Sequence, residues 1–133
     1  MVLKMVNDLD KYYEDKFRPL NQDFKNITTD WQMRKIGDRY EINDHKDLEY
    51  DFMVLDKLDD LHKRLNSVKL DLLSILPECE EYFVRLNKAK KRVDDLAYAY
   101  FTGTDVDSYH TVWFELHDYL IKKMGKEREE DEL

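Results

Sequence analysis

The sequence predicts an all-α fold, or an α fold with a small β-hairpin insertion, arranged as a bundle of about four helices. Only three glycines and two prolines occur in 133 residues, so turns are few and long helices are favoured. Apolar residues recur at spacings of three and four along most of the chain, which is the period of an α-helix. The length fits a single domain, which we expect to span residues 1–125.

The first helix is expected over residues 2–17. Its apolar face is formed by Leu3, Val6, Leu9, Tyr13 and Phe17. Pro19 should end or kink this helix, because proline has no backbone N–H to donate. The same spacing continues through Leu20, Phe24 and Ile27, which indicates a second short helix or a bent continuation.

Residues 28–43 predict a β-hairpin. Residues of similar character alternate on both sides of a turn at Gly37, which is typical of two short strands. The alternative is a short helix with a capping box at Thr29 and Gln32. A hairpin would present residues of the types that dominate binding hot spots on a projecting element, namely Trp31, Arg34, Arg39 and Tyr40. The alternative role for Trp31 and Tyr40 is to cap the end of the bundle.

A long helix near residues 44–76 is the strongest helical pattern. Asn43 or Asp44 can cap its first turn, and Pro77 marks its end. Its expected buried stripe consists of Leu48, Phe52, Leu55, Leu58, Leu61, Leu65, Val68, Leu72 and Ile75. Such a helix has to be covered by partner helices along one face.

Two further helices are expected, one from Pro77 to Gly103 and one that is capped by Thr104 or Asp105 and ends at Gly125. The connections between the last three helices are short, so these helices should run antiparallel. Residues 126–133 form a charged tail, which we expect to be disordered.

The formal net charge of −8 is concentrated at the two ends of the chain. Residues 1–60 carry −5 and residues 127–133 carry −4, whereas residues 61–126 carry +1. An acidic surface repels phosphate backbones and anionic lipid, so nucleic acid and membrane are disfavoured as partners. A basic partner protein is favoured, and Asp56, Asp59 and Asp60 on the long helix are candidate contacts.

Catalytic and metal-binding patterns are weak. Cys79 is the only cysteine, which fits a reducing cytoplasm. Asp59 with His62, and Asp107 with His110, have the spacing of neighbouring residues on a helix, but acidic residues are so common here that we expect no metal and no cofactor. Arg85, Lys88 and Arg92 share a helical face and could bind an anion, although a solvated, internally paired face is the simpler interpretation.

These observations favour a non-enzymatic protein-binding module, a regulator or inhibitor that docks on a basic partner. Toxin-immunity proteins and phage-encoded inhibitors share its size and charge, and nothing more. The alternatives are a homodimer that buries the long helix, a small metal-dependent or nucleotide-handling enzyme, and a nucleic-acid binder that uses residues 85–92.

Overall fold

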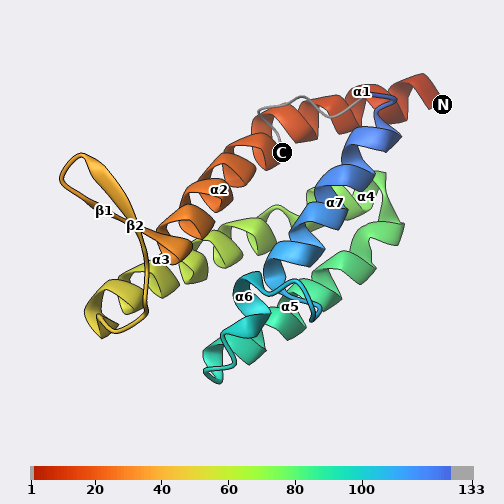
Figure 1. Ribbon diagram of the computed structural model, residues 1–133. Coiled ribbons are helices and arrows are strands. Elements are labelled where there is room, and N and C mark those ends of the chain that lie inside the picture. Colours follow the sequence, from red (N-terminus) through yellow and green to blue (C-terminus); the bar gives the residue numbers. More distant parts are fainter. Residues whose placement is uncertain (1, 127–133) are drawn as a thin grey trace. The chain divides into compact units, whose positions relative to one another are not determined.

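The computed structural model describes residues 2–126 and confirms the predicted fold class, a helical protein with one small hairpin (Figure 1). The strands β1 (Met33–Ile36) and β2 (Arg39–Ile42) form an antiparallel pair. The α-helices are α1 (Val2–Tyr12), α2 (Arg18–Gln32), α3 (Leu48–Ser67), α4 (Lys69–Ile75), α5 (Glu80–Asp94), α6 (Ala99–Thr102) and α7 (Tyr109–Lys123). The predicted disordered tail lies outside the described residues, apart from Lys126.

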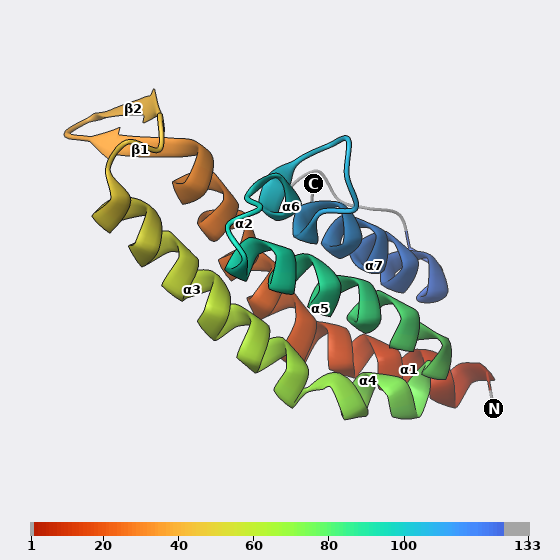
Figure 2. The ribbon, with the colours of Figure 1, turned by 90° about the horizontal axis from the view of Figure 1, so that it is seen from below.

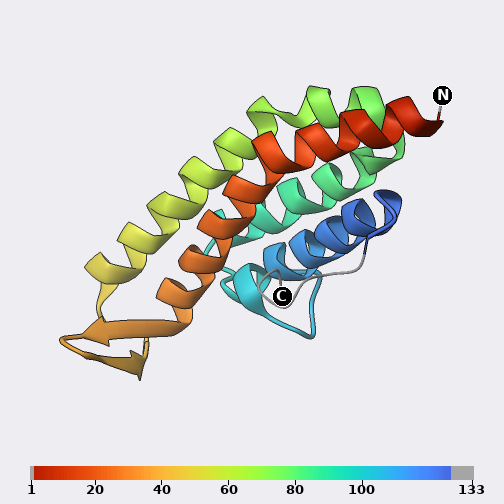
Figure 3. The ribbon, with the colours of Figure 1, turned by 90° about the horizontal axis from the view of Figure 1, so that it is seen from above.

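The chain groups into two compact units. One unit combines α1 with α4 to α7, and the other spans Glu14–Val68 and contains α2, the hairpin and α3. In the first unit, α5 and α7 lie side by side and run in opposite directions (Figure 2), as predicted, but α6 lies between them in the chain in place of the expected short loop. In the second unit, the hairpin joins the end of α2 to the start of α3, and these two helices pack along each other (Figure 3). The expectation of one domain over residues 1–125 stays a prediction.

Helical structure continues from α1 into α2 through a π-helical turn at Tyr13–Phe17. Pro19 lies in the first turn of α2, directly after this turn. A proline ring clashes with the carbonyl four residues earlier, and the wider π turn provides the extra room that an α turn lacks. Pro19 therefore reshapes the helix without ending it, in agreement with a continuation of the first helix.

The single helix predicted near residues 44–76 is interrupted. It begins at Leu48, where the Asp47 side chain accepts a hydrogen bond from the backbone N–H of Tyr50, and not at Asn43 or Asp44. It breaks at Val68, whose φ and ψ are −109° and 9°. Just before the break, the side chains of Asn66 and Ser67 donate to helix carbonyls at 3.0 and 2.6 Å. Side chains of this kind compete with the backbone ladder, so a continuous apolar stripe does not guarantee one helix.

The helix predicted from Pro77 to Gly103 is interrupted as well. α5 ends in a Schellman motif: the Leu96 N–H bonds the Val93 carbonyl and the Ala97 N–H bonds the Arg92 carbonyl, both at 2.9 Å. The motif needs a left-handed residue, and Leu96 supplies it with φ at 72°. The last helix ends in the same way, with Gly125 at φ 71°, so the predicted stop there is confirmed.

Leu96→Gly should stabilise the protein by about 0.5–1 kcal/mol, because glycine adopts positive φ without the steric cost that a leucine incurs. The Leu96 side chain is 70% exposed, so its removal forfeits little burial. Urea denaturation of the full chain measures the change. Val84→Gly, an exposed position inside α5, is the control and should destabilise by about 1 kcal/mol. A loss of stability in Leu96→Gly would contradict the assignment of strain.

Candidate functional site

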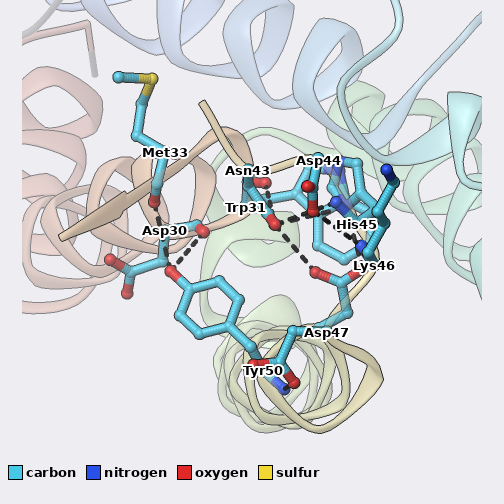
Figure 4. Close-up of polar contacts among 10 residues, drawn as sticks. Asp30, Trp31, Met33, Asn43, Asp44, His45, Lys46, Asp47 and Tyr50 are labelled. Carbon is cyan, nitrogen blue, oxygen red and sulfur yellow. Dashed lines mark hydrogen bonds and ion pairs between the residues drawn. The ribbon is translucent and has the colours of Figure 1, made fainter. Parts of the chain in front are cut away.

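A buried polar cluster joins the hairpin to both helices of its unit (Figure 4). Asn43, which is 4% exposed, directly follows β2. Its side-chain Nδ2 donates to the Trp31 carbonyl at the end of α2 and to the Asp51 carboxylate in α3, both at 2.9 Å. Its backbone N–H bonds the Gln32 carbonyl at 2.9 Å, which extends the hairpin pairing by one step. One residue therefore fixes the relative positions of α2, β2 and α3.

His45 closes this cluster from the solvent side. Its backbone is left-handed, with φ at 60°, and its N–H donates to the Asn43 side-chain oxygen at 3.1 Å. The ring lies 4.5 Å from the ring of Trp31, and Nδ1 lies 2.9 Å from Asp51 Oδ2. Trp31 is therefore buried in α2. The prediction that placed Trp31 on the projecting hairpin is wrong. The large ring of Trp31 is used to pack the end of the helix pair.

Arg34 and Tyr50 fasten the inner face of the hairpin to α3. The Tyr50 hydroxyl donates to the Asp30 carbonyl at 2.7 Å and lies 3.2 Å from the Met33 carbonyl. Desolvation, reinforced by Asp30, raises the pKa of Tyr50, so its hydroxyl stays a neutral donor. The Arg34 guanidinium sits 4.4 Å from the Tyr50 ring centre and pairs with Asp47 at 3.2 Å. Arg34 thus positions the hairpin.

The outer face of the hairpin is open. Gly37, with φ at 61°, provides the first residue of a two-residue turn, which is the form that suits a twisted hairpin. The cross-strand pair of Lys35 with Tyr40 lies on the face opposite Arg34. Tyr40 is 58% exposed, so its role as a contact residue stays a prediction. Arg39 is exposed and lies 3.5 Å from Glu41.

A groove of about 810 Å³ runs between α2 and α3. Seven charged residues line it, five acidic and two basic, so its formal net charge is −3. Two exposed apolar side chains, Phe52 and Met53, lie among them. The residues along its walls are Asp23, Asn26, Ile27 and Asp30 from α2, and Glu49, Phe52, Met53, Asp56, Lys57, Asp60 and Arg64 from α3.

Both basic residues of the groove are neutralised within it. Lys57 pairs with Asp30 at 3.3 Å. Arg64 pairs with Asp23 at 2.8 Å and with Asp60 at 3.0 Å. These pairs use three of the five acids and connect α3 to α2.

Two acids of the groove are left over. Glu49 and Asp56 have no ion pair or hydrogen bond from their side chains within residues 2–126. They lie on either side of Phe52 and Met53, whose exposed fractions are 52% and 46%. This exposed apolar pair, flanked by two carboxylates without a basic partner among the described residues, is the candidate binding site.

The predicted acidic contacts are partly brought together here. Asp56 and Asp60 line the groove, but Asp59 does not. Phe52 was expected in the buried stripe and is exposed instead, because α3 buries a neighbouring stripe. The members of that stripe are Asp51, Val54, Leu58, Leu61 and Leu65. Met53 was missed, and its only signal was its position beside Phe52.

One residue of the predicted anion site on α5, Arg85, is held by the protein's own carboxylates. Arg85 donates to Asp107 at 2.7 and 3.0 Å and to Glu115 at 2.9 and 3.1 Å. Its hydrogen bonds hold the pKa of Asp107 below the ordinary value. Lys88 is exposed, and Arg92 lies 5.2 Å from the centre of the Tyr100 ring. Arg85 is therefore a structural residue that links α5 to the loop before α7 and to the middle of α7.

Catalytic and metal-binding candidates gain no support from the geometry. Asp107 of the Asp107/His110 pair is held by Arg85. Within residues 2–126, no group of three or more histidine, cysteine, aspartate or glutamate side chains is placed to hold a metal ion. Cys79 is buried, and burial together with Glu78 raises its thiol pKa to about 12, which disfavours the nucleophilic thiolate.

Comparison with protein-family models, curated proteins and solved structures found no match to this chain. No helix in the described part of the chain combines the length and apolar character needed to cross a bilayer.

Asn43→Ala should destabilise the protein by about 2 kcal/mol, because it removes the hydrogen bonds that the amide donates to the Trp31 carbonyl and to a buried oxygen of Asp51. Urea denaturation measures the loss, and the exposed turn substitution Asp38→Ala serves as the control. Equal stability of the two variants would show that Asn43 does not hold the cluster together.

The Arg85 network should make stability depend on pH in acid. The folded pKa of Asp107 is depressed from 3.8, so its stabilisation is complete above the unfolded value and is lost as pH falls through the folded value. Arg85→Met should cost about 1 kcal/mol at neutral pH, since these pairs are part-exposed. The difference from wild type should shrink below about pH 3.8.

Denaturation at a series of pH values checks this dependence. Arg39→Met is the matched control, because its pair with Glu41 is highly exposed and its loss should change stability little at any pH. A gap between Arg85→Met and wild type that stays constant into acid would contradict the role of Asp107.

Proposed function

We propose that the protein is a non-enzymatic binding module that docks on a basic partner protein through the groove between α2 and α3, and that it acts as a regulator or inhibitor of that partner. The supporting observation is the pair Phe52 and Met53, exposed between two carboxylates that nothing in residues 2–126 neutralises. The single buried thiol agrees with a cytoplasmic setting.

The groove has the composition that a protein interface needs. Phenylalanine and methionine are enriched at the centres of interfaces, where they are desolvated by the partner. Methionine in addition adapts its shape to irregular apolar surfaces. The surrounding acids would then form a charged rim that selects a basic partner and disfavours an acidic one.

Charge also supports this choice of partner at long range. A net charge of −8 attracts a basic protein and accelerates association at low ionic strength. The same charge opposes nucleic-acid binding, and Arg85, the first residue of the basic run, is already held by two carboxylates. A nucleic-acid binder, a homodimer and an enzyme remain weaker alternatives, since no contact in residues 2–126 singles one of them out.

The groove variant Glu49→Lys/Asp56→Lys should reduce capture of the partner from source-cell extract at least about tenfold, because two attractive contacts become repulsive. The control Glu81→Lys/Asp105→Lys makes the same change of net charge on exposed positions outside the groove and should retain the partner. Quantitative mass spectrometry of nuclease-treated captures measures both.

Three outcomes would contradict the proposal. Equal loss in both variants would show that only net charge matters, and equal retention would place the interface elsewhere. A partner that is lost after nuclease treatment would favour nucleic-acid binding through residues 85–92.

A further inference from the structure

We infer that the segment bound in the groove is a cationic amphipathic α-helix of the partner protein. It would lie along α3, place an apolar side chain against Phe52 and Met53, and direct two cations toward Glu49 and Asp56. This inference rests on the proposed function, and it adds the secondary structure and the charge spacing of the ligand.

The walls of the groove favour a helix over an extended strand. Both walls are α-helices whose backbone groups are bonded within the helix, so they offer no strand edge for an added strand. Recognition must then come from side chains. Two packed helices leave a trough that a third helix can fill by ridges-into-grooves packing, with axes about 8–10 Å apart.

The spacing of the free carboxylates specifies the ligand further. Glu49 and Asp56 are seven residues apart in α3, which corresponds to about 10.5 Å along the axis. Two cations seven residues apart on a partner helix have the same separation and lie on nearly the same face. The apolar position between them would meet Phe52 and Met53. An extended strand covers this distance in about three residues, which leaves less room for an apolar anchor between the two cations.

The two carboxylates should not contribute equally. Glu49 lies in the first turn of α3, where the positive end of the helix dipole already stabilises its charge. Asp56 lies in the third turn and receives no such compensation. Asp56 should therefore contribute more to the attraction of a cation than Glu49 does, and the two single variants can separate these contributions.

The test uses two synthetic fifteen-residue peptides of identical composition and the full-length protein. In the first peptide, two lysines at i and i+7 flank a leucine at i+3 or i+4. In the second, the same residues alternate with period two. Isothermal titration at low salt should show that the first peptide binds at least about tenfold more tightly, and ¹⁵N chemical-shift mapping should place it at Phe52, Met53 and Asp56.

Variants of the protein sharpen the result. Asp56→Asn should weaken the helical peptide more than Glu49→Gln does, by about threefold against less than twofold, and Glu81→Gln should leave it unchanged. Equal affinity for the two peptides, chemical shifts confined to the hairpin face of Tyr40, or peptide-free self-association through the groove would each overturn the inference. The partner capture above would still decide the proposed function on its own, because it does not depend on the form of the bound segment.

Discussion

The second unit depends on one buried hydrogen-bonded contact, between the amide of Asn43 and the carboxylate of Asp51. Two polar groups are withdrawn from water there, and the arrangement is stable because each finds partners in the other and in neighbouring groups. A polar contact is directional in a way that leucine packing is not. It sets the rotation of α3 about its own axis, and this rotation decides that Asp51 points inward while Phe52 and Met53 line the groove.

Much of the fold could be predicted from the sequence because its signals are local. Few turn-makers, three-four spacing and an alternating segment around Gly37 were enough for the fold class and the hairpin. The two breaks, at Val68 and Leu96, were not predictable in the same way. At Val68 the competing donors are ordinary surface side chains, and at Leu96 a leucine occupies a position where glycine is the expected signal. The spacing of apolar residues shows where a helix is favoured. It does not reveal a single residue whose backbone departs from the helical conformation.

Only part of the candidate site could be predicted from the sequence. Acidic residues at Asp56 and Asp60 could be proposed from charge alone, and both line the groove. Trp31 was misplaced because aromatic residues are common in cores and in interfaces, and its burial in α2 against the His45 ring shows which use applies. Phe52 fits the helical stripe as well as the true core residues do. Which of two overlapping stripes is buried depends on the polar contacts of Asp51 with Asn43 and His45, which apolar periodicity does not reveal.

Because Lys57 and Arg64 are paired with other acids, Glu49 and Asp56 are the groove charges that can select a partner. At physiological ionic strength an exposed charge is felt over about 8 Å. The spacing of Glu49 and Asp56, about 10.5 Å, exceeds this length, so an approaching molecule senses the two carboxylates one at a time. A diffuse cationic surface is therefore attracted only weakly by the groove. A rigid molecule with a cation at each of the two positions is attracted by both carboxylates. In this way an acidic protein can still discriminate among basic partners by geometry.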